Sequence, residues 1–118
     1  MMPITAAFAH EWVDAWNRRD LESLLSHYSD DIEFRSSLVA RLGGAASGTI
    51  SGKTALREYF QKALAAFPGE LGLELLGAYQ GAGSIVVLFE ARGRKAAEYM
   101  EFNAEGAVCR ASAHSQAV

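Results

Sequence analysis

The chain has 118 residues, half of them hydrophobic, and carries a formal net charge of −3 with acidic and basic side chains interleaved. This length predicts one domain, residues 1–118, with ample apolar material for a core. The charges form no basic surface for nucleic acid and no acidic disordered tail, so we expect no nucleic-acid partner.

The sequence also argues against membranes and metals. Its longest apolar run, residues 85–89, is far too short to span a bilayer, so no membrane partner is expected. Residues 1–4 lack the regions of a secretory signal, and Cys109 is the single cysteine, so we predict a cytoplasmic protein without disulfides. No histidine pair has metal-ligand spacing, and neither a metal nor another cofactor is expected.

Two helices are predicted at the start of the chain. Phe8, Trp12 and Trp16 recur every four residues, which places them on one helical face, and the polar residues 17–19 end that helix. Asp20 is a suitable N-cap for the second helix. Its apolar residues follow the spacing i, i+3, i+4, i+7: Leu21, Leu24, Leu25 and Tyr28.

A strand and a loop are predicted next. Ile32, Phe34 and Ser36 alternate with polar neighbours, which predicts a half-buried strand with Ser36 on its inner face. Residues 39–51 contain several glycines and little to bury, and so predict a mobile loop. We expect Ser51 to cap the following helix.

The rest of the chain predicts a third helix and a sheet. Apolar residues at helical spacing run from Leu56 to Phe67, and Pro68-Gly69 ends the helix. The period then changes to two, with strands predicted from Glu70 and over 84–91, 96–103 and 107–115. Short turns between them predict an antiparallel meander. The predicted fold is α+β: three helices packed on a strongly curved, mostly antiparallel sheet, a cone with room for a pocket.

Glu98 is the sharpest candidate for chemistry. On its strand, Ala96, Glu98, Met100 and Phe102 form the more apolar set, so Glu98 should face inward. Burial disfavours the charged form of a carboxyl and raises its pKa, giving an acid that donates a hydrogen bond or proton near pH 7. The alternative is a core glutamate tied to an arginine or tyrosine.

The candidate ligand-binding residues are mostly aromatic. Aromatic side chains commonly line pockets, although at helical spacing they are more often plain core. The predicted binding residues are Trp12, Trp16, Tyr28, Phe34, Ser36, Tyr59, Phe60 and Met100. A strand-end Ser36 bonded to the backbone is the stronger alternative for that residue. His114 should face outward, unless its strand slips by one residue.

Several short strings resemble the nuclear transport factor 2-like superfamily, and most closely its SnoaL-like and ketosteroid isomerase-like members. They run through nearly the whole chain: Trp16-Asn17, Asp20, Tyr28-Ser29-Asp30-Asp31, Gly52, Tyr59-Phe60, Phe89-Glu90, Gly93-Arg94-Lys95 and Phe102-Asn103. The resemblance implies the cone-shaped fold, and it implies a dimer. That fold hosts enzymes, binders and transport adaptors alike.

The isomerase-like members imply roles for individual positions. They use an aspartate base on the first strand, a tyrosine on the first helix and a protonated acid on the penultimate strand. These positions match Ser36, Trp12 and Glu98 here, while Tyr28 and Tyr59 match residues that line or support the pocket. Ser36 cannot take a proton at neutral pH, and Trp12 has only an indole N–H to donate.

Two functions follow as hypotheses. The first is a pocket for a small apolar, carbonyl-containing molecule, with isomerase, cyclase or dehydratase chemistry carried by Glu98. The alternative is a non-catalytic ligand-binding or dimerisation module. A transport adaptor is less favoured, because no exposed aromatic patch is evident. The implied homodimer would use the outer face of the sheet, with Tyr99, Glu101, Arg110 and His114.

Overall fold

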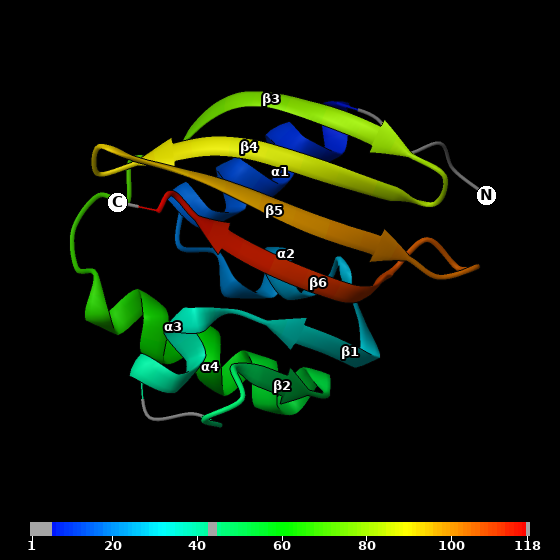
Figure 1. Ribbon diagram of the computed structural model, residues 1–118, viewed down its shortest axis with the longest axis horizontal. Coiled ribbons are helices and arrows are strands. Elements are labelled where there is room, and N and C mark those ends of the chain that lie inside the picture. The colour runs from blue at the N-terminus through cyan, green and yellow to red at the C-terminus, as the bar shows by residue number, and fades with distance from the viewer. Residues whose placement is uncertain (1–5, 43–44, 118) are drawn as a thin grey trace.

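The computed structural model describes residues 6–42 and 45–117. The fold is α+β, as predicted, with helices covering one face of a curved, open sheet (Figure 1). The helices are α1 (Ala6–Asn17), α2 (Leu21–Leu25), α3 (Ser37–Arg41) and α4 (Lys53–Ala66). The strands are β1 (Tyr28–Arg35), β2 (Thr49–Ser51), β3 (Glu74–Gly81), β4 (Ser84–Ala91), β5 (Arg94–Phe102) and β6 (Val108–Ser115).

The sheet has the strand order β2-β1-β6-β5-β4-β3. Strands β3 to β6 form the predicted antiparallel meander, and only the β1–β6 pairing is parallel. Strand β3 begins at Glu74 and not at Glu70, because Gly72 has a φ of 65° and interrupts extended backbone. Leu76 lies at a register shift between Leu75 and Gly77.

The beginning of the second helix is as predicted, but its end is not. Asp20 caps α2, accepting hydrogen bonds from the Ser23 amide at 3.2 Å and the Ser23 hydroxyl at 2.7 Å. The helix ends at Leu25, although the apolar spacing extended to Tyr28. Tyr28 instead opens β1 and pairs with Val108 of β6. Strand pairing here overrides a locally satisfactory helical pattern.

The predicted loop over 39–51 contains regular structure. Ser36 ends the strand by capping α3, its hydroxyl accepting a hydrogen bond from the Leu38 amide at 3.2 Å. Strand β2 then pairs antiparallel with β1. Ser51 belongs to β2, and the N-cap of α4 is Gly52, whose φ of 92° favours glycine. The described residues therefore contain four helices where the sequence predicted three.

Two polar side chains at the α1–α2 junction hold the segment that leaves α4. Asn17 donates to the Leu73 carbonyl at 2.9 Å and accepts from the Leu73 amide at 2.8 Å. Arg19, with a φ of 57°, donates to the carbonyls of Leu64 at 2.9 Å and Gly69 at 2.7 Å, and also to that of Phe67. Arg19 thus satisfies carbonyls at the C-terminal end of α4.

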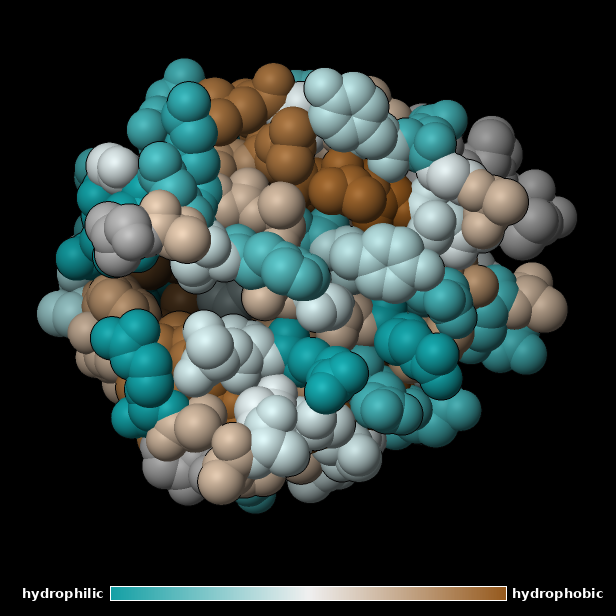
Figure 2. Space-filling model, viewed as in Figure 1, coloured by the Kyte–Doolittle hydropathy of each residue, from teal (hydrophilic) through white to brown (hydrophobic). Residues whose placement is uncertain are grey.

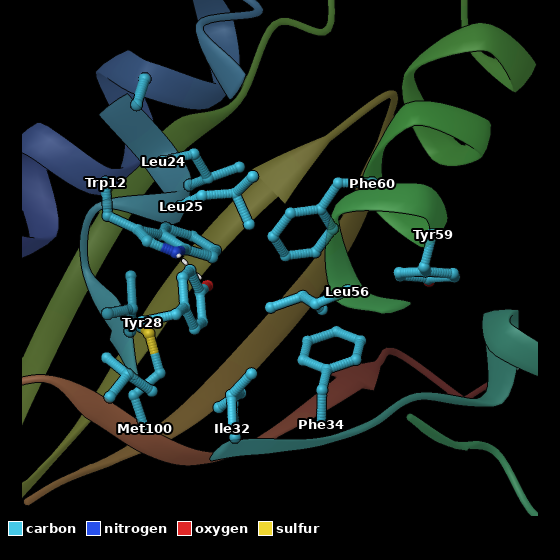
Figure 3. Close-up of a cluster of buried hydrophobic side chains, with 14 of the residues drawn as sticks. Trp12, Leu24, Leu25, Tyr28, Ile32, Phe34, Leu56, Tyr59, Phe60 and Met100 are labelled. Carbon is cyan, nitrogen blue, oxygen red and sulfur yellow. Dashed lines mark hydrogen bonds between the residues drawn. The ribbon is translucent and has the colours of Figure 1, made fainter. Parts of the chain in front are cut away.

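The core lies between the helices and the inner face of the sheet. Figure 3 shows side chains from α1, α2, β1, α4 and β5 converging there. Ring contacts cross the layers: Trp12 meets Phe89 at 5.5 Å between centroids, and Trp16 meets Phe60 at 4.9 Å. Within residues 6–42 and 45–117, no helix has both the length and the apolar character needed to cross a membrane.

Candidate functional site

A cavity of about 330 Å³ lies between α1, α4 and the inner face of the sheet. Its walls are mainly apolar and aromatic, as small-molecule pockets usually are. Helix α1 contributes Trp12 and Trp16, while α4 contributes Tyr59, Phe60 and Ala63. The segment between α4 and β3 adds Phe67 and Leu71, and the strands add Phe34, Phe89, Ala96 and Ala113.

Glu98 is the one buried charged residue among those described, and its side chain lies on the cavity wall with 5% of the residue exposed. The alternation of β5 predicted this inward direction correctly. No hydrogen bond or ion pair reaches Glu98 from any residue the structure describes. Removal from water raises the pKa of the Glu98 carboxyl to about 8. At pH 7 the group is therefore mostly neutral and can donate a hydrogen bond.

The two tryptophans of α1 have different hydrogen-bonding states. The Trp12 indole N–H donates to the Tyr28 hydroxyl at 3.1 Å, deep in the core (Figure 3). That N–H is thus occupied, which corrects the sequence-based assignment of Trp12 as the donor facing a ligand. The Trp16 indole nitrogen is buried, and the described residues offer it no partner.

Ser36 and Tyr59 form the polar part of the wall opposite the sheet. The Ser36 hydroxyl caps α3, as the stronger alternative predicted, and the residue also lines the cavity. Burial raises the pKa of Tyr59, an effect that a hydrogen bond with Ser36 opposes. Neither group can accept a proton at neutral pH, so no general base other than Glu98 itself faces this part of the cavity.

The structure separates the predicted binding residues into two groups. Those on the cavity wall, with Glu98, are Trp12, Trp16, Phe34, Ser36, Tyr59 and Phe60. Tyr28 and Met100 do not reach the wall, which corrects their placement. Both are at most 2% exposed and belong to the packed core. Tyr28 lies at the start of β1 and not at the end of a helix, and Met100 lies two residues beyond Glu98 on β5, further from the cavity.

Cationic residues at the cavity mouth were missed as a group by the sequence analysis. Arg92, Arg94 and Lys95 all contribute to the lining. The arginines and the lysine follow one another around the β4–β5 turn, a cue that sequence reasoning treated as turn chemistry alone. His114 is exposed, pairs in register with Ala97 and also borders the cavity mouth, and the register shift between β5 and β6 lies elsewhere, between Glu101 and Phe102.

A second depression of about 420 Å³ is lined by Asp30, Lys53 and Glu58 and lies at the N-terminal end of α4. It lacks the apolar walls and the unpaired buried group of the first. Across the part of the chain that the structure describes, no three histidine, cysteine or acidic residues gather as a metal site would require. The cavity beside Glu98 is therefore the candidate site.

Helices packed on a curved, mostly antiparallel open sheet define the nuclear transport factor 2-like class of fold, and solved structures confirm it. A model of the SnoaL-like domain family matches residues 9–115, and the chain belongs to that family. The comparison with curated proteins gives no match.

Three solved structures illustrate the similarity. A SnoaL-like protein of unknown function from Burkholderia thailandensis is 35% identical with a TM-score of 0.88, covering 98% of this chain and 100% of that one. A nuclear transport factor 2-like protein of unknown function from Burkholderia pseudomallei is 18% identical with a TM-score of 0.79, covering 98% and 92%. A candidate SnoaL-like polyketide cyclase from Shewanella denitrificans is 13% identical with a TM-score of 0.73, covering 98% and 92%.

Proposed function

We propose that the cavity binds a small apolar molecule with a carbonyl group, and that neutral Glu98 donates a hydrogen bond to the carbonyl oxygen. The unpaired, buried Glu98 on an apolar wall carries this proposal. A buried polar group without a partner costs free energy. A ligand carbonyl would supply the missing partner, and the aromatic walls would hold the rest of the molecule.

Proton transfer next to that carbonyl is the chemistry the site supports best. A donor to the carbonyl oxygen stabilises negative charge as it develops there, as in enolisation, cyclisation or dehydration. With a pKa of about 8, Glu98 is ionised in about a tenth of molecules at pH 7, so it can also accept a proton. One carboxyl could then serve in both directions of a proton shuttle.

Glu98→Gln tests the role of the carboxyl. Glutamine keeps a hydrogen-bond donor but cannot transfer a proton, so ligand binding should survive and turnover should not. Wild-type affinity for an apolar ketone should fall above pH 8 as Glu98 ionises, while that of Glu98→Gln should stay constant from pH 5 to pH 9. Glu101→Gln, a change of the same type on the outer face of β5, is the control. Equal profiles for wild type and Glu98→Gln would remove Glu98 from the mechanism.

A non-catalytic binding module is the second candidate. It is favoured by Ser36, which stands where the isomerase-like proteins carry their base and whose hydroxyl caps α3. A thermal-shift screen of apolar ketones, followed by product analysis, separates the two functions. Binding by wild type without any conversion supports the module.

We also propose a homodimer through the outer face of the sheet. Tyr79 and Leu76 of β3 are 66% and 47% exposed, and Tyr79 pairs across Val86 with Tyr99. Figure 2 shows hydrophobic side chains gathered over β3 and β4 on this face. Sedimentation of Tyr79→Glu beside wild type, with Lys62→Glu on the exposed side of α4 as control, tests the proposal. A wild-type monomer at high concentration would refute it.

A further inference from the structure

We infer that the ligand is an amphipathic organic anion, whose acidic group is bound by Arg92 and Arg94 at the cavity mouth while its apolar body extends toward Glu98. This inference rests on the proposed function and narrows its ligand class. The structure supports it through the charges at the mouth, the way the arginines are held, and the length of the strand between them and Glu98.

The mouth carries a charge opposite to that of the protein. The whole chain has 14 acidic residues and 11 lysines and arginines, yet its cavity is lined by Arg92, Arg94 and Lys95 and by a single acid, the buried Glu98. The ion pairs of arginines among the described residues involve Arg18 and Arg57, which lie elsewhere. Within residues 6–42 and 45–117, no carboxylate forms an ion pair with Arg92, Arg94 or Lys95, and an anionic ligand would neutralise these cations.

Both arginines are positioned by contacts that leave donors for a ligand. The Arg92 guanidinium lies 5.3 Å from the centre of the Phe67 ring, and its Nη2 donates to the Pro68 carbonyl at 3.3 Å. Arg94 Nη2 donates to the Gln116 carbonyl at 2.9 Å. A guanidinium has five N–H donors in a planar fork that matches a carboxylate, sulfonate or phosphate. One hydrogen bond each holds the arginines in place without using up their donors.

The strand sets the length of the ligand. Arg94 and Glu98 are four residues apart on the same face of β5, or about 13 Å at roughly 3.3 Å per residue. The wall between them is apolar and includes Ala96, Ala113 and Phe89. An ionised group at the inner end would be buried without a counter-charge, which is strongly unfavourable. The acid of the ligand should therefore lie at the mouth and its hydrogen-bond acceptor near Glu98.

Two fluorescent probes with related bodies test this inference: 8-anilinonaphthalene-1-sulfonate, an anion, and N-phenyl-1-naphthylamine, which lacks the sulfonate. Wild type should bind the anion more tightly. Exposed ion pairs are weak, so Arg94→Gln should reduce affinity for the anion about two- to fivefold, and Arg92→Gln with Arg94→Gln about tenfold. Affinity for the neutral probe should change less than about twofold, and added salt should diminish the difference between probes.

Arg35→Gln is the matched control, because Arg35 is exposed on β1 on the face opposite the buried Phe34. Displacement of the neutral probe by decanoate and by 1-decanol gives a second measurement, in which decanoate should compete better and lose this advantage in the double variant. Failure of wild type to bind the neutral probe would overturn the proposed apolar site. Binding of the neutral probe with no preference for anions, or equal losses in Arg35→Gln and Arg94→Gln, would overturn this inference alone.

Discussion

The two ends of β5 face interiors of different character. Toward its C-terminal end, Met100 is fully buried and Phe102 packs edge-on against Phe8 at 5.2 Å between ring centres. Toward its N-terminal end, Ala96 and Arg94 face the cavity. Strand β6 repeats the contrast, with buried Val108 and Ala111 at the closed end and Ala113 on the cavity wall.

Polar groups differ between the two ends in the same way. At the closed end, the buried N–H of Trp12 donates to the Tyr28 hydroxyl, although His27 Nε2 nearby is buried without a hydrogen bond from the described residues. At the open end, the described residues provide no partner for the Trp16 indole nitrogen or the Glu98 carboxyl. The closed end is thus built for stability. The open end has small side chains and the unpaired groups of Trp16 and Glu98, so it should be less tightly packed than the closed end.

The largest effect expected from this contrast concerns the pH dependence of folding stability, which should differ between wild type and Glu98→Gln. Burial raises the pKa of Glu98 to about 8 from its ordinary value of 4.5, so the folded state holds a proton that the unfolded state releases. Between these values wild-type stability should fall by about 1.4 kcal/mol per pH unit, and in total by on the order of 5 kcal/mol. The contribution is fully present below pH 4.5 and is lost as pH rises through 8.

Urea unfolding at a series of pH values measures this effect. The difference between wild type and Glu98→Gln isolates it, because other groups, including His27 with its pKa lowered by burial, are the same in both proteins. Glu101→Gln should follow the wild-type curve. A constant difference between wild type and Glu98→Gln from pH 5 to pH 8 would show that Glu98 is hydrated in the folded protein.

Deleting one large side chain at each end sharpens the comparison. Met100→Ala should lower the free energy of unfolding by about 3 kcal/mol, since its neighbours enclose it on all sides. Leu71→Ala should cost less, about 1 to 2 kcal/mol, because one side of Leu71 already faces empty space and fewer contacts are lost. Urea denaturation of both variants checks the order. A larger loss for Leu71→Ala would mean that the cavity wall is as tightly packed as the core.

Breaking the polar pair at the closed end should have a smaller effect. Tyr28→Phe removes the acceptor of the Trp12 N–H and leaves that donor buried, at a cost of about 1 to 3 kcal/mol. Tyr59→Phe, a change of the same type at the open end, should cost less than about 1 kcal/mol, because Tyr59 is at the margin of the core. Equal losses in thermal or urea unfolding would contradict the proposed difference between the ends.

The sequence predicted the closed end better than the open one, for physical reasons. The alternation along β5 was enough to predict that Glu98 and Met100 face inward. It holds because the pairing of β4 with β5 has no register shift from Ser84 and Glu101 to the turn. Parity says nothing about depth, so Met100 was assigned to the pocket although it lies in the packed core. Tyr28 was assigned to a helix because the local spacing allowed it, whereas its pairing with Val108 is a contact between distant parts of the chain.

The cavity at the open end exists because large side chains are absent there, and a sequence pattern does not reveal such an empty space. Ala96 and Ala113 looked like ordinary strand residues, and only the folded structure shows that their small size leaves a hollow. The arginines of the β4–β5 turn likewise gained meaning only when Pro68 and Gln116, distant in sequence, were found beside them.

Ala113→Val is the smallest expected change and tests the hollow directly. Ala113 lies opposite Glu98 in the pairing of β5 with β6, and valine suits a strand while adding two methyl groups to the cavity. Partial filling should raise the free energy of unfolding by less than about 1 kcal/mol and weaken binding of N-phenyl-1-naphthylamine several-fold. Ala97→Val, the same change on the outer face of β5, should leave binding unaltered. If both variants bind the probe like wild type, the ligand lies elsewhere, and the small residues of the open end have no role in making room for it.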